Sequence, residues 1–202
     1  MTILLTGYEA FADWYVNPTA IAVETLNGLT IGEHHIEGRV LPLRYKEIRP
    51  TLSQLVTQIR PDAILLSGQT GGDKIRLEQQ AFNWAEAKVP YNCGTLVTGE
   101  ELVAGATEIL TSGLPLQQME QNLRDHHIPV RLSDTAGRFG CNQVFYYARL
   151  DFPGIPSGFV HVPSLPEQVA ADKPSMPQQV ITTALKLCLE VLAEELSQSS
   201  QR

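Results

Sequence analysis

A cysteine and a histidine are the side chains of this chain whose type and surroundings best suit them to do chemistry. Cys141 follows the small-residue segment 135–140 and opens an apolar, helix-like stretch. The start of a helix carries unpaired N–H groups and partial positive charge, and both favour a thiolate over a thiol. His161 stands near the end of a short apolar strand, Gly158–Val162. If folding brings the two together, they form the nucleophile and base of a cysteine hydrolase.

The imidazole of such a base needs a third group to orient it. The sequence leaves five acidic residues open for this role: Asp13, Asp73, Glu78, Asp134 and Glu167. A core cysteine and a hydrogen-bonded strand histidine are the alternative interpretation of the pair. Gly137 and Gly140 favour the chemical interpretation, because a backbone without side chains can approach a ligand and aim N–H groups at it.

The remaining cysteines and histidines predict no second site. Cys188 lies inside an apolar helical stretch and is expected in the core, whereas Cys93 lies in a turn and is expected at the surface. No Cys-x-x-Cys or His-x-x-x-His pair occurs, so no metal is expected. Gly68–Gly72 lacks the ending of a phosphate loop, so no nucleotide cofactor is expected. Two histidine doublets are expected to be solvated: His34-His35 and His126-His127.

Composition narrows the class of protein. The chain has 202 residues and is 43% hydrophobic, which suffices for the core of one domain over residues 1–202 without disulfides. A net charge of −7 without a dense basic run argues against nucleic-acid binding and against attraction to anionic membranes. The N-terminus lacks a basic start, and no stretch approaches the roughly 20 apolar residues of a membrane span. We therefore expect a cytoplasmic protein whose thiols stay reduced.

Short apolar runs alternate with longer helical patterns, which predicts an α/β sandwich around a mostly parallel sheet. Strands are expected over Ile3–Thr6, Gly38–Leu43, Asp62–Ser67, Pro129–Leu132 and Gly158–Val162. Helices are expected over Pro18–Leu26, Pro50–Ile59, Leu116–His126, Asn142–Leu150 and Pro177–Leu196. Asn17 is the expected N-cap of the first helix, and residues 197–202 are expected to fray. The loops after the strands should build the site.

Five segments, in order along the chain, resemble one family: Leu4–Phe11 with Asn17–Thr19, Pro61–Gly72, Leu77–Asn83, Thr135–Asn142 and Gly158–Gln168. Together they resemble pyroglutamyl peptidase I, also called pyrrolidone-carboxylate peptidase. The resemblance covers nearly the whole length, and the cysteine and histidine motifs are its most specific parts. It implies a three-layer α/β/α cysteine exopeptidase without cofactors. Such an enzyme removes an N-terminal pyroglutamyl group from a peptide with a blocked N-terminus and is a homo-oligomer, a tetramer or a dimer.

The resemblance also assigns roles to single residues. Cys141 would be the nucleophile, His161 the base, Glu78 the orienting acid, and Lys88 part of the oxyanion region. The family's ring-binding pocket maps to Tyr8, Phe11, Asn17, Gln69, Val89, Phe139 and Gly140. Pyroglutamate is a compact, uncharged lactam, so aromatic walls and a few hydrogen-bonding groups suit it.

This chain departs from the family's pattern around that pocket. Tyr8 stands where the family has phenylalanine, Leu43 where it has threonine, Lys88 where it has arginine and Gly140 where it has valine. Lysine keeps the charge but loses the planar fork of arginine, and the other changes alter the shape of the pocket. A different small N-terminal acyl or amide substrate is therefore one alternative, and a non-catalytic binding protein is another.

Overall fold

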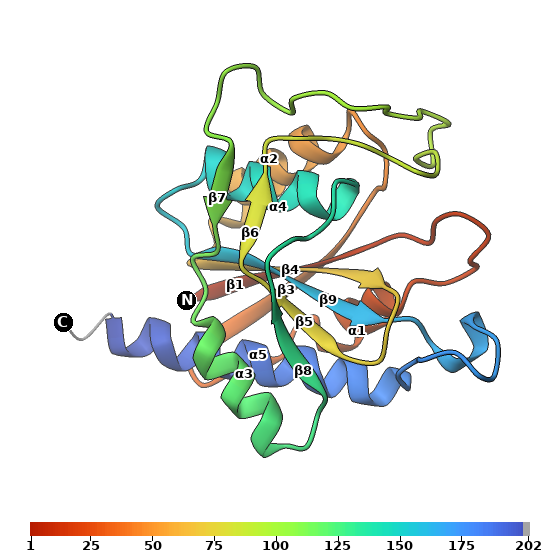
Figure 1. Ribbon diagram of the computed structural model, residues 1–202. Helices are drawn as coiled ribbons and strands as arrows, with labels where there is room; N and C mark the ends of the chain where they lie inside the picture. The colour runs from red at the N-terminus through yellow and green to blue at the C-terminus, as the bar shows by residue number, and fades with distance from the viewer. Residues whose placement is uncertain (200–202) are drawn as a thin grey trace.

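The computed structural model describes residues 1–199, and a seven-stranded sheet forms its centre (Figure 1). The strands follow the order β2-β3-β1-β4-β9-β5-β8. Their bounds are β1 (Thr2–Tyr8), β2 (Thr30–Ile31), β3 (His34–Leu41), β4 (Ala63–Thr70), β5 (Ile75–Glu78), β8 (Val130–Ser133) and β9 (Ser157–Pro163). The neighbours β3, β1, β4 and β9 are parallel, whereas β5 runs antiparallel to β9 and β2 antiparallel to β3. The prediction of a mostly parallel sheet is confirmed.

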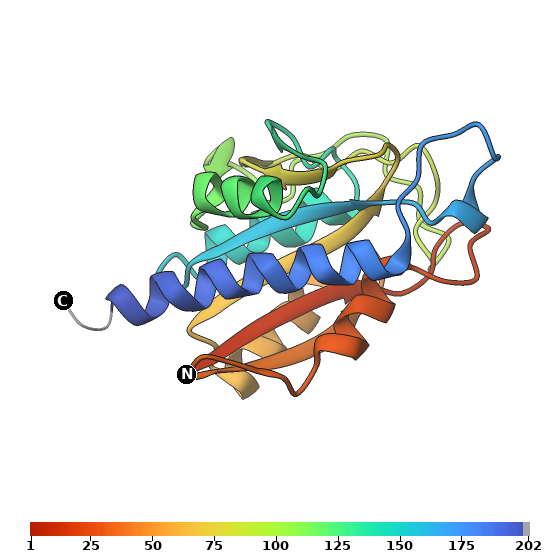
Figure 2. The ribbon, with the colours of Figure 1, turned by 90° about the horizontal axis from the view of Figure 1, so that it is seen from below.

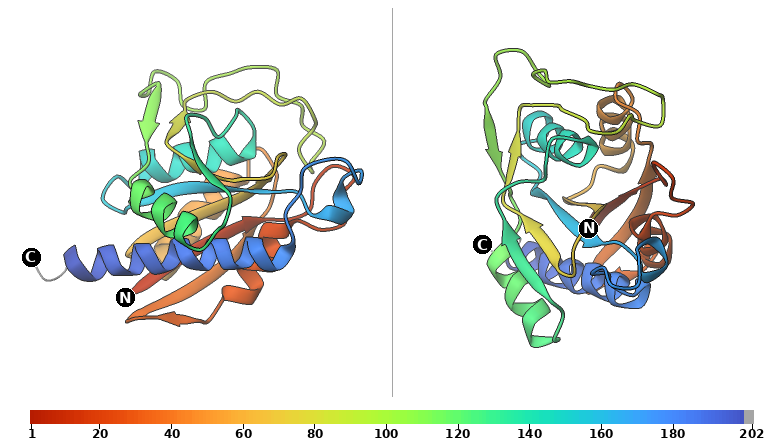
Figure 3. Two further views of the ribbon diagram at one scale, coloured as in Figure 1. Left: turned by 60° about the horizontal axis from the view of Figure 1, so that its bottom comes forward. Right: turned by 45° about the vertical axis from the view of Figure 1, so that its right-hand side comes forward.

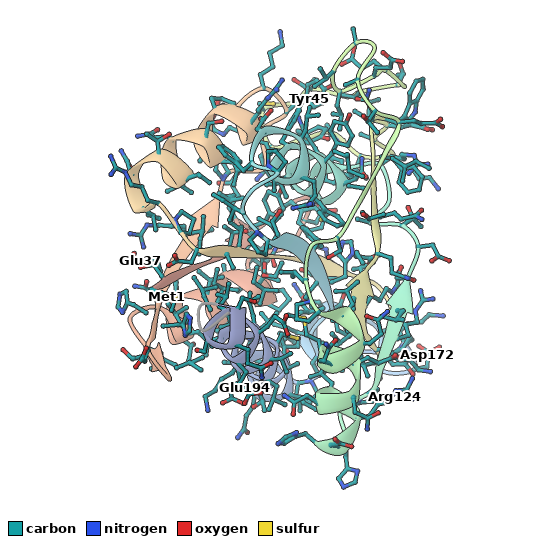
Figure 4. The ribbon with its side chains drawn as sticks, turned by 90° about the vertical axis from the view of Figure 1, so that its left-hand side faces the viewer. Met1, Glu37, Tyr45, Arg124, Asp172 and Glu194 are labelled. Atoms are coloured by element: carbon teal, nitrogen blue, oxygen red, sulfur yellow. The ribbon has the colours of Figure 1, made fainter. Side chains whose placement is uncertain are left out.

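Helices cover both faces of the sheet and complete three layers (Figures 1 and 2). Their bounds are α1 (Pro18–Leu26), α2 (Ile48–Ile59), α3 (Leu116–Asp125), α4 (Gly140–Asp151), α5 (Gln178–Ser199) and the 3-10 turn η1 (Pro166–Gln168). One apolar core lies under α1, α3 and α5, and a second lies under α2 and α4. Tyr45 lies on the side of the second core, whereas Arg124 and Glu194 lie on the opposite side (Figure 4).

Local sequence accounts for the elements that carry the site. The side chain of Asn17 accepts a hydrogen bond from the backbone N–H of Thr19 at 3.0 Å, and Pro18 occupies the first turn, so the predicted cap of α1 is confirmed. Strand β4 is buried from Ala63 to Gln69, as expected for a central strand covered by helices on both faces. No helix in the described part of the chain is both long and apolar enough to cross a bilayer.

Several boundaries differ from the sequence prediction. Strand β3 starts at His34 and ends at Leu41, because pairing with β2 extends it toward its N-terminal end. That pairing buries His34 completely, so the expectation of a solvated side chain is wrong for this residue. Helix α5 continues to Ser199, so fraying is wrong for residues 197–199, while residues 200–202 lie outside the described part.

A short second sheet lies in the middle of the chain, where the sequence has no clear period. It pairs β6 (Gln80–Phe82) with β7 (Ile109–Thr111) and lies beside α4 (Figure 3). Buried Asn142 joins this sheet to α4, because its side-chain amide donates to Phe82 O at 2.8 Å and accepts from Phe82 N at 2.8 Å. The first turn of α4 is therefore held from two sides, by the central sheet and by β6.

Candidate active site

Cys141 lies in the first turn of α4, against the C-terminal end of the central sheet, where the arrowheads of β4 and β9 lie in Figure 1. A Cβ atom added to Gly68 of β4 would lie 2.8 Å from Cys141 Sγ, a distance too short for any side chain. Gly68 is also the register partner of His161 on β9. The sheet therefore brings the sulfur to the strand position that carries the histidine, as the sequence analysis required.

His161 contacts both Cys141 and Glu78. Its Nδ1 lies 2.8 Å from Glu78 Oε1, and its imidazole is close enough to the side chain of Cys141 for the two to interact electrostatically. The antiparallel pairing of β5 with β9 explains the contact with Glu78, because Glu78 opposes Phe159 and so lies diagonally across from His161 on the same face. Of the five acidic residues left open by the sequence, Glu78 is fully buried. The other four are exposed: Asp13, Asp73, Asp134 and Glu167.

Cys141 and Glu78 both raise the pKa of His161. Burial alone lowers the pKa of His161, but the interaction with Cys141, and then that with Glu78, outweigh burial and raise this pKa to about 9. The arrangement thus favours the imidazolium form of His161 at neutral pH. Glu78 Oε2 is buried and has no hydrogen-bond partner among the described residues, so the carboxylate depends on His161 to offset its charge.

A small hollow opens beside the sulfur. It has an empty volume of about 260 Å³, and its lining comes from the ends of β1 and β4, the loops after β1 and β3, and the start of α4. The lining residues are Tyr8, Phe11, Asn17, Leu43, Gln69, Phe139 and Cys141. Aromatic and aliphatic carbon makes most of the wall, which suits a compact ligand with few polar atoms.

Gln69 supplies the hollow with a hydrogen-bond acceptor. Its side-chain nitrogen donates to Ser164 Oγ at 3.0 Å and to Gln168 Oε1 at 2.9 Å. Gln168 Oε1 also accepts from Leu165 N at 2.8 Å, and these contacts fix which end of the Gln69 amide is nitrogen. Gln69 Oε1 is buried and has no partner among the described residues. A buried acceptor without a partner is costly, so this oxygen is suited to an N–H donor on a ligand.

The structure gathers most, but not all, of the residues predicted to bind the ring. Tyr8, Phe11, Asn17, Gln69 and Phe139 line the hollow together with the sulfur. Gly140 is buried behind the wall, where its carbonyl accepts a hydrogen bond from the Tyr8 hydroxyl. Val89 lies in a neighbouring groove with Ala10, Asp13 and Tyr91. Lys88 is exposed and does not line the hollow.

Sequence reasoning did not single out Ser164 or Gln168, which hold the amide of Gln69. Ser164 follows directly on β9, and Gln168 ends the short turn η1 that comes next. Polar residues in the segment after a buried strand are the signal by which they are recognisable. No group of three or more metal-binding side chains is arranged to hold an ion within residues 1–199.

Two of the departures from the family's pattern compensate each other in space. A Cβ atom on Gly140 would overlap Leu43 Cδ1 and lie 3.4 Å from Ile48 Cδ1. The leucine side chain therefore occupies the space that a side chain at position 140 would need. The wall of the hollow stays filled although two of its residues have changed size.

We expect Gly140→Ala to destabilise the native protein but not a protein that already carries Leu43→Ala. In the native background the added methyl group meets Leu43 and lowers the free energy of unfolding by about 1–3 kcal/mol. In a Leu43→Ala background the methyl group enters vacated space and is neutral or stabilising, since alanine also suits a helix better than glycine by up to about 1 kcal/mol. Chemical denaturation of the four proteins measures the coupling.

Gly154→Ala provides the matched control, because no atom lies within 4 Å of a Cβ at that position. It should show no coupling to Leu43→Ala. Additive free energies for Gly140→Ala and Leu43→Ala would contradict the proposed compensation.

Comparison with known proteins places this geometry in a family. The family model described as pyroglutamyl peptidase matches residues 1–195. Two relatives named pyrrolidone-carboxylate peptidase are similar in sequence. The protein of Coprothermobacter proteolyticus is 36% identical, and the match covers 96% of this chain and 98% of the relative. The protein of Pyrococcus furiosus is 35% identical, and the match covers 97% of this chain and 100% of the relative.

Solved structures agree with the sequence comparison. A crystal structure of a mutant pyrrolidone carboxyl peptidase from P. furiosus superposes with a TM-score of 0.93 at 33% identity. The match covers 97% of this chain and 100% of that one. A further structure of the peptidase from the same organism gives a TM-score of 0.92 at 32% identity. The likeness therefore extends over the whole arrangement of sheet and helices described above.

Proposed function

The chain belongs to the pyroglutamyl peptidase family, a family of cysteine peptidases, and from this premise we propose that it removes N-terminal pyroglutamyl groups from peptides. The observation that carries the proposal is the connected series Cys141–His161–Glu78 at the rim of a small, mostly apolar hollow. A nucleophile, a proton donor and an orienting carboxylate are the groups that acyl transfer through a thiol requires.

The reaction proceeds by two acyl transfers. The Cys141 thiolate attacks the carbonyl carbon that joins pyroglutamate to the next residue, and the carbonyl oxygen becomes an oxyanion. As this intermediate collapses, the C–N bond breaks and the His161 imidazolium gives its proton to the leaving amine, which leaves a thioester on the sulfur. The neutral imidazole then takes a proton from water, and the resulting hydroxide attacks the thioester. Collapse releases pyroglutamate and restores the thiolate–imidazolium pair.

The backbone N–H of Cys141 is the proposed donor to the oxyanion. It lies in the first turn of α4, where N–H groups have no acceptor within the helix and where the helix dipole favours negative charge. A donor aimed at the charge that develops in the transition state lowers the activation barrier more than a donor aimed at the substrate carbonyl. The predicted contribution of Lys88 to the oxyanion requires its exposed side chain to move toward the bound peptide.

The chemistry of the hollow favours pyroglutamate over other small acyl groups. A lactam ring presents an apolar body, one N–H and one carbonyl. Gln69 Oε1 is a buried acceptor without a partner in residues 1–199, and an N–H donor on the ring satisfies it. A ring of the same shape without the N–H leaves that oxygen desolvated and unpaired, which costs binding energy.

We expect Gln69→Met to remove the preference for the lactam over an isosteric lactone, in which oxygen replaces the ring N–H. The native protein should cleave the lactam amide at least about 10²-fold faster than the lactone amide in terms of kcat/KM, because the lactone leaves a buried acceptor unpaired. Methionine keeps the volume of glutamine but has no such acceptor, so the two substrates should react at similar rates. Parallel kinetics on both substrates measure the ratio.

Gln178→Met is the matched control. Gln178 also has a side-chain oxygen that finds no partner among the described residues. It donates to the backbone carbonyl of Pro18 at 3.1 Å, but it does not line the hollow. It should leave the lactam preference intact. A native protein that cleaves both rings equally would favour another acyl substrate for this site.

Three further proposals concern the protein as a whole. We propose that residues 1–202 act as one domain, which the family match over residues 1–195 supports. A cytoplasmic location suits a thiolate nucleophile, which must stay reduced. A homo-oligomer, tetramer or dimer, follows from the resemblance, and light scattering on the purified protein in solution tests it.

A further inference from the structure

We propose that the hydroxyl group of Tyr8 is a positioning group for the reaction: it holds the Gly140–Cys141 peptide so that the N–H of Cys141 faces the oxyanion. The inference rests on the proposed function, because it concerns the donor named above. Tyr8 reaches this donor through the peptide group, by a hydrogen bond to the carbonyl oxygen of Gly140.

The contact lies between two rigid elements. Tyr8 is the last residue of β1 and is 2% exposed, and its hydroxyl donates to the carbonyl oxygen of Gly140 at 2.7 Å. Its backbone N–H donates to Thr19 Oγ1 at 3.1 Å, which ties the end of the strand to α1. Burial raises the pKa of Tyr8 well above its ordinary value, and the neighbouring charges of Cys141 and Tyr91 add to the effect. The hydroxyl therefore keeps its proton and remains a donor throughout the working pH range.

The peptide needs this restraint because residue 140 is glycine. Gly140 has no Cβ to limit its backbone angles, and it is the first residue of α4. A peptide unit is planar and trans, so a carbonyl fixed at one end fixes the direction of the N–H at the other. Together with the helical backbone of α4, the hydrogen bond on the carbonyl of Gly140 thus sets the orientation of the N–H of Cys141. It also polarises the peptide group and so strengthens that N–H as a donor.

Leu43 closes the remaining side of Gly140, since its Cδ1 fills the space of the absent side chain. Tyr8 and Leu43 are both buried and both line the hollow that contains the sulfur. The segment before the nucleophile is therefore held by side chains from β1 and from the loop after β3, while glycine contributes none of its own.

Tyr8→Phe tests the proposal, because it removes one oxygen atom and keeps the aromatic wall. We expect kcat for a pyroglutamyl amide to fall on the order of 10-fold with KM little changed, since the loosened donor acts only on the transition state. A pyroglutamyl aldehyde, whose adduct with the thiol carries the oxyanion, should bind weaker by the same factor. Binding of 2-pyrrolidone, which has the lactam ring but no carbonyl group at the reacting position, should stay constant.

Tyr146→Phe is the matched control. Tyr146 lies on α4, the helix that also contains Gly140, and is fully buried. Its hydroxyl donates to the backbone carbonyl of Thr107 at 2.6 Å. Loss of that bond affects stability alone. Equal kcat values for Tyr8→Phe and Tyr146→Phe, or unchanged aldehyde binding in Tyr8→Phe, would overturn the positioning role. A native protein without activity on pyroglutamyl amides would instead overturn the proposed function on which it rests.

Discussion

Hydrolysis of a pyroglutamyl chromogenic amide is expected to fall at least about 10³-fold when Cys141 is replaced by serine. The serine hydroxyl is a much weaker acid than a thiol, so His161 cannot hold it as an anion at neutral pH. The side chain keeps nearly the same shape, and the fold should therefore be unaffected. Initial rates of the two proteins at equal concentration measure the effect.

Cys93→Ser is the matched control, because Cys93 is an exposed thiol outside the hollow. Its rate should stay within about twofold of the native protein, as is usual for surface substitutions. Equal rates for the native protein and Cys141→Ser would refute the assignment of the nucleophile.

Alkylation distinguishes a peptidase from a binding protein that retains the fold. Cys188 is fully buried, and burial raises its pKa to about 12, so it should resist iodoacetamide in the folded protein. In a Cys93→Ser background, labelling should therefore report on Cys141, with a rate that reflects a thiolate. Uniformly slow labelling would favour the binding protein.

Replacing Glu78 with glutamine is expected to lower kcat on the order of 10³-fold, because the amide removes the charge that orients and stabilises the imidazolium. The same change should alter the pH profile. The pKa of His161 is raised to about 9, so the native protein should lose activity as pH rises through about 9, where the imidazolium loses its proton. Without Glu78 one of the contributions that raise this pKa disappears, and the alkaline limb should move to lower pH.

The free energy of unfolding should fall over the same pH range as the activity. The imidazolium is favoured in the folded state, so its contribution is fully present below the unfolded pKa of about 6.5 and is lost as pH rises through about 9. Glu167→Gln removes an exposed carboxylate from the turn after β9 and serves as the matched control for both measurements. An alkaline limb at the same pH in Glu78→Gln and in the native protein would contradict the coupling of Glu78 to His161.

The sequence by itself determined the class of fold and predicted the nucleophile–base pair. Apolar runs such as 63–67 and helical periods such as 180–192 are local patterns, and burial in a layered α/β protein follows from them. Cys141 was recognisable because glycines precede it and an apolar helix follows it. The resemblance to a family then added the substrate and the candidate pocket residues.

Tertiary structure decided which groups meet. Local patterns left five acidic residues open as partners of His161, and only the family resemblance pointed to Glu78. The antiparallel register of β5 on β9 places Glu78 beside His161, a pairing across 83 positions that no local pattern encodes. The burial of His34 and the β6–β7 sheet likewise depend on strand pairing rather than on periodicity.

The wall of the hollow also shows contacts that the tertiary structure reveals and the sequence does not. Leu43 and Gly140 each look like an isolated departure in the sequence, yet in space one side chain fills the volume that the other lacks. The free oxygen of Gln69 and the bond from Tyr8 to the carbonyl of Gly140 also join segments that are distant in the chain. Sequence fixes what each residue is able to do, whereas only packing between separate elements fixes which partner it finds, because contact distances depend on the whole fold.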